Sequence, residues 1–188
     1  MDKTIFSALI PDAPAKARDT VARTLSRYGE PALRFAAANN VCVRILKPRE
    51  TYARASASLA RLGLDVDAWP APPAGLFVVE ERTVYLRSCS PMTIAHEFGH
   101  ALDCVLGGGI YLSGIDPAIR ECFSNAHSFV TPYCASGLDE FMAECLRSYI
   151  GVNDEQSAWP QVNPERLRSI DPVMFSICQQ IFAKFNST

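Results

Sequence analysis

Two histidines four positions apart, with a glutamate beside the first, are the residues of this sequence best suited to chemistry. His96, Glu97 and His100 form the pattern H-E-x-x-H. Residues four apart lie on one face of an α-helix, so both imidazoles can reach a single metal ion. Glu97 then lies beside the open coordination position and can act as general base toward a water molecule there. The motif predicts a catalytic zinc site on a helix.

A third protein ligand must come from elsewhere in the chain, because catalytic zinc takes three and leaves the fourth position open. A metzincin would need a glycine at position 103 and a histidine at position 106, where this chain has Asp103 and Leu106. The remaining choice is a glutamate on a later helix, and three are candidates: Glu121, Glu140 and Glu144. Glu121 has the spacing of a thermolysin-like ligand but lacks the N-E-x-x-x-D pattern. His127 is a weaker rival.

The stretch 91–106 is predicted to be the helix that carries the motif. Ser90 can act as its N-cap and Pro91 as its first residue. Apolar side chains recur in it at helical spacing and can be buried: Ile94, Phe98, Ala101, Leu102 and Val105. A chance match to so short a motif is the alternative. Two of the chain's three histidines fall in the motif, however, and its flanks are apolar, as such a site requires.

The other local patterns predict an α+β protein. Strands are expected over 41–46, 76–79 and 83–86, and the last two form a β-hairpin that leads directly into the motif helix. Helices are expected over 15–28, 31–38, 50–62, 117–127 and 138–150, with two more beginning near 164 and 172. Residues 1–11 are expected to be an irregular arm, 65–75 a loop, and 110–115 an apolar loop or short strand. The hairpin edge could pair with an extended substrate, although an ordinary structural hairpin fits equally well.

Composition indicates one soluble globular domain spanning residues 1–188. The chain is 48% hydrophobic and 20% charged, with a formal net charge of −2, which gives no electrostatic basis for binding nucleic acid or a membrane surface. Its apolar runs are shorter than the roughly 20 residues that cross a membrane. The patch at 5–10 is too short for a secretory signal core of about 7–15 residues. Seven cysteines without a C-x-x-C pair are expected to be reduced and mostly buried.

The stretch 133–150 resembles the catalytic domain of anthrax lethal factor and, more loosely, the proline–proline endopeptidases that share its fold. The likeness rests on the pattern Y-x6-E-F-x-A-E, formed by Tyr133, Glu140, Phe141, Ala143 and Glu144. H-E-F-G-H at 96–100 is also the form found in lethal factor. Pro-Glu-Arg-Leu at 164–167 and the amphipathic C-terminal segment continue the resemblance, which runs from about residue 84 to the end and is not traceable through residues 1–70.

The resemblance implies a zincin-like fold, in which a small sheet with a hairpin packs against the metal helix and the C-terminal helices. It implies three zinc ligands: His96, His100 and Glu140. Glu97 is then the base, Tyr133 the phenol that stabilises the oxyanion, and Glu144 the group that orients a ligand imidazole. Relatives of lethal factor act on proteins of another cell or on secreted proteins. A secreted effector or toxin with a role in virulence, exported by a route other than Sec, follows from the resemblance alone.

We therefore expect a zinc metalloendopeptidase that cleaves a protein or peptide bound extended along the edge of the hairpin Leu76–Leu86, and that acts as a monomer. Three alternatives stay open. The first is a zinc hydrolase of a small amide, the second is a non-catalytic interaction module that keeps the zinc, and the third is a thermolysin-type site that uses Glu121.

Overall fold

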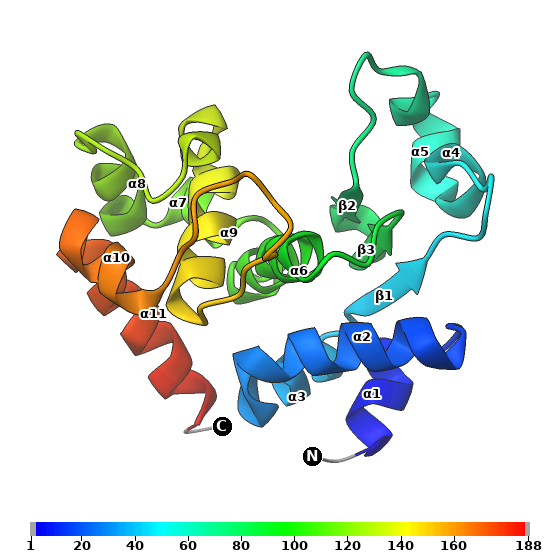
Figure 1. The fold of residues 1–188 in the computed structure, drawn as a ribbon, viewed down its shortest axis with the longest axis horizontal. Coiled ribbons are helices and arrows are strands. Elements are labelled where there is room, and N and C mark those ends of the chain that lie inside the picture. Colours follow the sequence, from blue (N-terminus) through cyan, green and yellow to red (C-terminus); the bar gives the residue numbers. More distant parts are fainter. Residues whose placement is uncertain (1–2, 187–188) are drawn as a thin grey trace.

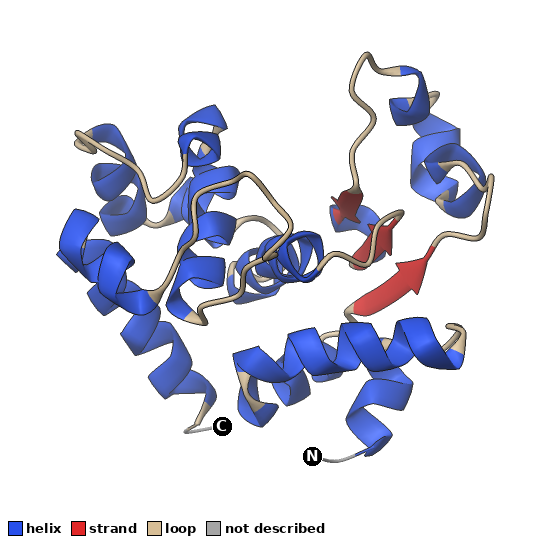
Figure 2. Cartoon of the chain, in the orientation of Figure 1, coloured by secondary structure: helices blue, strands red, loops and turns tan. Residues whose placement is uncertain are grey.

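The computed structural model describes residues 3–186 and consists of a small sheet on one side of a central helix, with further helices on the other side (Figure 1). The architecture is mixed α+β, as predicted, and helices occupy far more of the chain than strands (Figure 2). The helices before the sheet hairpin are α1 (Lys3–Leu9), α2 (Ala15–Leu25), α3 (Glu30–Ala38), α4 (Tyr52–Ala55) and α5 (Ala57–Leu62). Those after it are α6 (Pro91–Leu106), α7 (Leu112–Ile115), α8 (Pro117–Ser124), α9 (Leu138–Tyr149), α10 (Pro164–Ile170) and α11 (Pro172–Phe185).

The sheet has the strand order β1-β3-β2, with β1 (Cys42–Ile45) parallel to β3 (Thr83–Leu86) and β2 (Gly75–Val78) antiparallel to it. The predicted hairpin is therefore present. Successive side chains of a strand point to opposite faces, and both faces of this sheet are covered. Phe77 and Val84 face the main core, while Val78 and Tyr85 face a second, smaller core built by α4 and α5.

Helix α6 runs through the middle of the molecule, between the sheet and α9 (Figure 1). The five apolar side chains predicted to bury it are all buried: Ile94, Phe98, Ala101, Leu102 and Val105. The helix begins at Pro91, as expected. Ser90 occupies the N-cap position, as expected, but its side chain makes no capping bond. Its hydroxyl instead donates to the carboxylate of Asp154, at 2.7 Å.

Three local predictions differ from the structure. The arm expected over 1–11 is helical over Lys3–Leu9, because Ile5, Leu9 and Ile10 are buried in the main core; residues 1–2 lie outside the described part. The helix expected over 50–62 is broken at Ser56, whose hydroxyl caps α5 by accepting a bond from the Leu59 amide. The segment 110–115, expected to be an apolar loop or a short strand, contains the short helix α7.

The structure is consistent with two expectations drawn from composition. Within residues 3–186, no helix is long and apolar enough to cross a membrane. All seven cysteines fall in the described part of the chain and are free, and four of them are buried: Cys104, Cys134, Cys145 and Cys178.

Candidate active site

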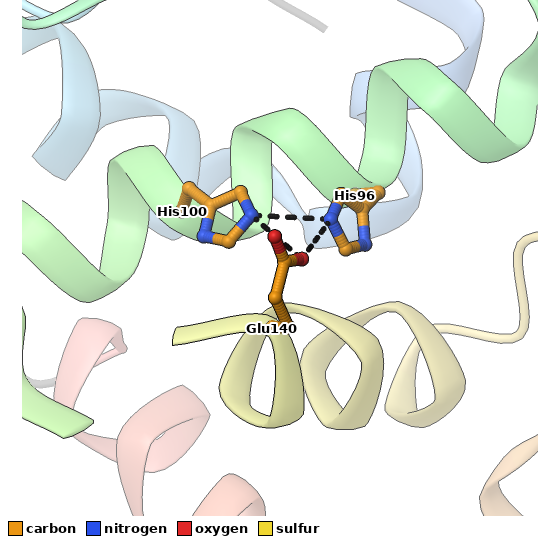
Figure 3. A group of neighbouring side chains, drawn as sticks. All are labelled: His96, His100 and Glu140. Carbon is orange, nitrogen blue, oxygen red and sulfur yellow. Dashed lines mark hydrogen bonds and ion pairs between the residues drawn. The ribbon is translucent and has the colours of Figure 1, made fainter. Parts of the chain in front are cut away.

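His96 and His100 lie one turn apart on α6 and face Glu140 in the first turn of α9 (Figure 3). The His96 Nε2 atom is 2.8 Å from the Glu140 Oε2 atom and 3.1 Å from the His100 Nε2 atom. The His100 Nε2 atom is 3.3 Å from the same carboxylate oxygen. Both imidazoles are buried, and Glu140 is partly buried. Two imidazole nitrogens and one carboxylate oxygen therefore converge on one point.

This donor set fits a zinc ion. Imidazole and carboxylate are ligands that zinc accepts, at about 2.0–2.2 Å, and in a tetrahedral site such bonds place neighbouring ligand atoms roughly 3.3 Å apart. The three separations of 2.8, 3.1 and 3.3 Å are close to that value. Among the described residues, these three form the group of His, Cys, Asp and Glu side chains that could hold a metal ion. Three ligands leave one tetrahedral position open, as catalytic zinc requires.

Glu144 lies one turn further along α9 and fixes the orientation of His96. The His96 Nδ1–H donates to the Glu144 carboxylate at 2.9 Å, which turns the Nε2 atom toward Glu140 and makes it the atom that would bind a metal. Thr131 and Arg147 donate to the same carboxylate, at 2.6 Å and at 2.8–2.9 Å. Burial by itself raises the pKa of Glu144, but the hydrogen bonds from His96 and Arg147 hold it well below its ordinary value. The carboxylate therefore stays ionised and can orient the ring.

Glu97 lies beside the histidines against the sheet edge. Burial raises its pKa above the ordinary value, and the nearby His96 and His100 partly oppose the shift. A glutamate with a raised pKa is suited to act as a base near neutral pH. Gly75 makes room for this side chain, because a Cβ atom there would lie 2.5 Å from the Glu97 Cγ atom and 2.8 Å from the Thr93 Cγ2 atom.

Tyr133 belongs to a 3₁₀ turn, η4 (Pro132–Ser136), just before α9. Its hydroxyl donates to the Glu140 Oε1 atom at 3.1 Å, and its ring centroid is 5.4 Å from that of His96. Burial, followed by the charge of Glu140, raises the pKa of the phenol well above 10. The hydroxyl is therefore a protonated hydrogen-bond donor at neutral pH, next to the predicted metal ligands.

The rival third ligands lie elsewhere. Glu121 is exposed on α8 and lines a separate cavity of about 470 Å³ together with His127, and neither belongs to the metal-ligand group. The structure therefore places Glu140, the glutamate that the resemblance implies, beside the two motif histidines. It places Glu121, the thermolysin-type candidate, on a different surface.

Several residues of the site could not be found from the sequence. A Cβ atom at Gly99 would lie 3.0 Å from the Ala143 Cα atom, so this glycine permits the close approach of α6 and α9. Thr131 and Arg147 complete the hydrogen bonds to Glu144, and Trp159 reaches the site from a loop. The sequence carries a signal for only one of these features: positions 99 and 143 carry small residues. Small residues indicate tight helix packing, but the sequence does not say which helix is the partner.

A cleft of about 210 Å³ opens beside the motif, between the end of the loop that leads into β2 and the α9–α10 loop. His96, Glu97 and Tyr133 form part of its wall. The rest of the wall consists of the ion pair between Glu144 and Arg147 and of smaller or apolar residues: Pro73, Ala74, Gly75, Met92, Thr93 and Trp159. The predicted metal site therefore opens onto a space that other molecules can enter.

Strand β2 lies at the edge of the sheet next to this cleft, and its backbone has groups free of β3. The Arg87 amide donates to the Ala74 carbonyl, and residues of an antiparallel pair alternate between bonded and non-bonded positions. Together with the register Gly75↔Leu86, this alternation turns the backbone groups of Gly75 and Phe77 away from β3. The outer edge of β2 therefore faces Glu97, and the Phe77 amide donates to the Glu97 carboxylate.

A small sheet with an H-E-x-x-H helix beside its edge strand, and a second helix that supplies a carboxylate, is the arrangement of the zincin-like α+β class. Among solved structures, the chain has the fold of a Pro-Pro endopeptidase from Paenibacillus alvei, with a TM-score of 0.65 and 16% sequence identity, over 94% of this chain and 99% of the other. Neither a protein-family model nor a curated protein sequence matches the chain. The structural likeness supports the fold of the proline–proline endopeptidases and does not bear on lethal factor.

Proposed function

We propose that this protein is a zinc-dependent endopeptidase. The proposal rests on one observation: His96, His100 and Glu140 converge from two helices, with Glu97 beside them in the wall of a cleft. The shared fold with a Pro-Pro endopeptidase supports it, since that protein is a peptidase.

Each residue of the site has a distinct role in the proposed hydrolysis. The two histidines and Glu140 would hold a zinc ion, which would supply Lewis-acid chemistry at this position. Glu97 accepts the proton of the attacking water and delivers it to the leaving amine. The Tyr133 hydroxyl moves from Glu140 to the oxyanion that develops on the scissile carbonyl. Glu144 keeps the His96 ring in the orientation and tautomer that ligation needs.

The proposed substrate is an extended peptide that pairs with the outer edge of β2. Such pairing would use the outward-facing backbone groups of Gly75 and the Phe77 carbonyl, because the Phe77 amide already donates to Glu97, and it would leave alternate side chains to fill pockets. A cleft of about 210 Å³ is smaller than the roughly 300–1,000 Å³ of small-molecule pockets. This volume favours a single peptide side chain over a whole small amide substrate.

We extend the proposal to a secreted effector or toxin that cleaves proteins of another cell. It rests on the resemblance to lethal factor. The finding that would support it is a cleaved target outside the producing cell.

The decisive experiment compares wild type with Glu97→Gln. We expect both purified proteins to hold one zinc per chain by elemental mass spectrometry, because Glu97 is not a ligand. We expect only wild type to produce new termini in a peptide library followed by mass spectrometry. Wild type that holds zinc and produces no new termini would contradict the proposal, as would equal cleavage by both proteins.

Two further variants test the ligand set. Glu140→Ala is expected to lose zinc, because it removes one of three ligands. Glu121→Ala is the matched control and is expected to keep it, because Glu121 lies on a different surface. The reverse result would restore the thermolysin-type alternative.

A further inference from the structure

Trp159 extends from the loop between α9 and α10, which passes across α6 (orange in Figure 1). Its side chain lines the same cleft as His96 and Glu97, and its ring centroid lies 6.2 Å from that of Tyr133, in an edge-to-face arrangement. It remains 46% exposed. A large apolar ring left half-exposed beside reactive groups can gain further contact area when a ligand binds.

The loop that presents Trp159 is fastened at both ends. The Asn153 side chain donates to the Val162 carbonyl and accepts from the Val162 amide, each at 2.8 Å, which closes the loop on itself. The Asp154 carboxylate accepts from the Ser90 hydroxyl at the start of α6. A surface held in this way loses little conformational freedom on binding, so its contacts contribute more fully to affinity.

The loop is also connected to the metal ligands. The Arg147 guanidinium donates to the Val152 carbonyl at 2.8 Å and to Glu144, which holds His96. Because Arg147 and Glu144 form an ion pair with each other, neither is available to pair with a charged group of a ligand. The groups next to Trp159 that a ligand would meet are mainly apolar, and they include Pro73 and Met92.

We propose that Trp159 is a specificity-determining residue that contacts an apolar side chain of the substrate next to the scissile bond. The proposal rests on the peptidase function. A space of about 210 Å³ suits one side chain. An acidic side chain would lose its hydration among Trp159, Pro73 and Met92 and would meet the Glu97 carboxylate in the same wall, while Arg147 is already paired with Glu144.

The test compares wild type, Trp159→Ala and Trp69→Ala on peptides in which each residue flanking the scissile bond is varied. Trp69 is the control because it is the chain's other tryptophan, is 53% exposed and does not line the cleft. We expect Trp159→Ala to lower kcat/KM for the best apolar peptide by about tenfold or more, mainly through KM. Its preference for apolar over Ser or Asp at that position should weaken, while Trp69→Ala should match wild type.

Trp159→Phe is expected to recover part of the loss, because it restores an apolar ring, and zinc content should equal that of wild type in all three variants. If wild type cleaves no peptide, both the peptidase proposal and this one fail. If wild type cleaves and Trp159→Ala keeps the same preference and KM, only the proposal for Trp159 fails.

A binding measurement provides a readout that does not need turnover. In Trp69→Phe/Glu97→Gln, Trp159 is the chain's single tryptophan. Titration with the best apolar peptide, labelled for anisotropy, should shift Trp159 emission along the same binding curve that anisotropy reports. Binding by anisotropy with unchanged Trp159 emission would overturn the proposal.

Discussion

Glu144 accepts hydrogen bonds from three side chains, and its position decides which nitrogen of His96 faces the metal site. A buried carboxylate without partners would be costly, but here Arg147 and Thr131 complete its bonds. The same Arg147 also holds the start of the loop that carries Trp159. At the scale of single residues, one buried ionic group therefore connects a predicted metal ligand to the wall of the cleft.

Tyr133→Phe isolates the proposed oxyanion donor. Because the phenol touches Glu140 through a single hydrogen bond, we expect zinc content to stay at one per chain. Loss of an oxyanion donor typically lowers kcat by about 10²–10³, so steady-state kinetics should show this fall with little change in KM. Tyr149→Phe, at the other end of α9, is the matched control and should behave as wild type. An unchanged kcat in Tyr133→Phe would remove Tyr133 from the mechanism.

The contact between α6 and α9 sets the spacing of the metal ligands at the scale of elements. Gly99 lies between His96 and His100 in the sequence, and it packs against Ala143, between Glu140 and Glu144. Any side chain at 99 would press on the α9 backbone. The two helices must approach this closely for the imidazoles of one to meet the carboxylates of the other.

Gly99→Ala tests this role. The added methyl should lower the free energy of unfolding by roughly 1–3 kcal/mol through overpacking. It should also weaken zinc binding, because the ligands lie on both helices. Urea unfolding of metal-free protein and competition with a zinc chelator measure the two effects separately. Gly114→Ala is the control, since a Cβ atom there would meet nothing within 4 Å. Equal zinc affinity in the two variants would contradict the argument.

Elements with strong local signals could be predicted from the sequence, and those that depend on distant partners could not. The hairpin and α6 follow from alternation, helical spacing and Pro91. The break at Ser56 was missed because it also depends on Glu81, 25 residues away, which accepts bonds from Ser56 and from the Ser58 amide. Spacing alone left three glutamates open as third ligand. Only the packing of α9 on α6 distinguishes Glu140 from the others.

At the scale of the whole molecule, a further acidic side chain is buried: Asp103 on α6. Its carboxylate accepts from the Ser113 amide and hydroxyl, at 2.9 and 2.6 Å, and ties α7 to the metal helix. Burial raises the pKa of Asp103 to about 6, although the bonds from Ser113 partly oppose the shift. The folded state therefore binds this proton more tightly than the unfolded chain does.

This difference predicts a pH dependence of stability. Between about pH 4 and pH 6 the folded state holds the Asp103 proton and the unfolded state has lost it, so the contribution of this group to stability falls as pH rises. A shift of roughly two units corresponds to about 3 kcal/mol. Urea unfolding of metal-free wild type and Asp103→Asn at pH 4, 5, 6 and 7 should show wild type losing stability relative to the variant across this range. A difference that is constant with pH would show that Asp103 does not titrate there.

Because Gly75 leaves space for the Glu97 side chain, the proposed peptidase activity depends on the register of β2 against β3. If β2 slipped by one residue against β3, Ala74 or Leu76 would come opposite Glu97, and its Cβ atom would enter the space that Gly75 leaves free. The same slip would turn Phe77 from the main core to the opposite face. A chain that misfolds in this way would displace Glu97, the proposed base, and would also lose core packing. During refolding, recovery of the proposed peptidase activity therefore requires that the hairpin has closed in the correct register.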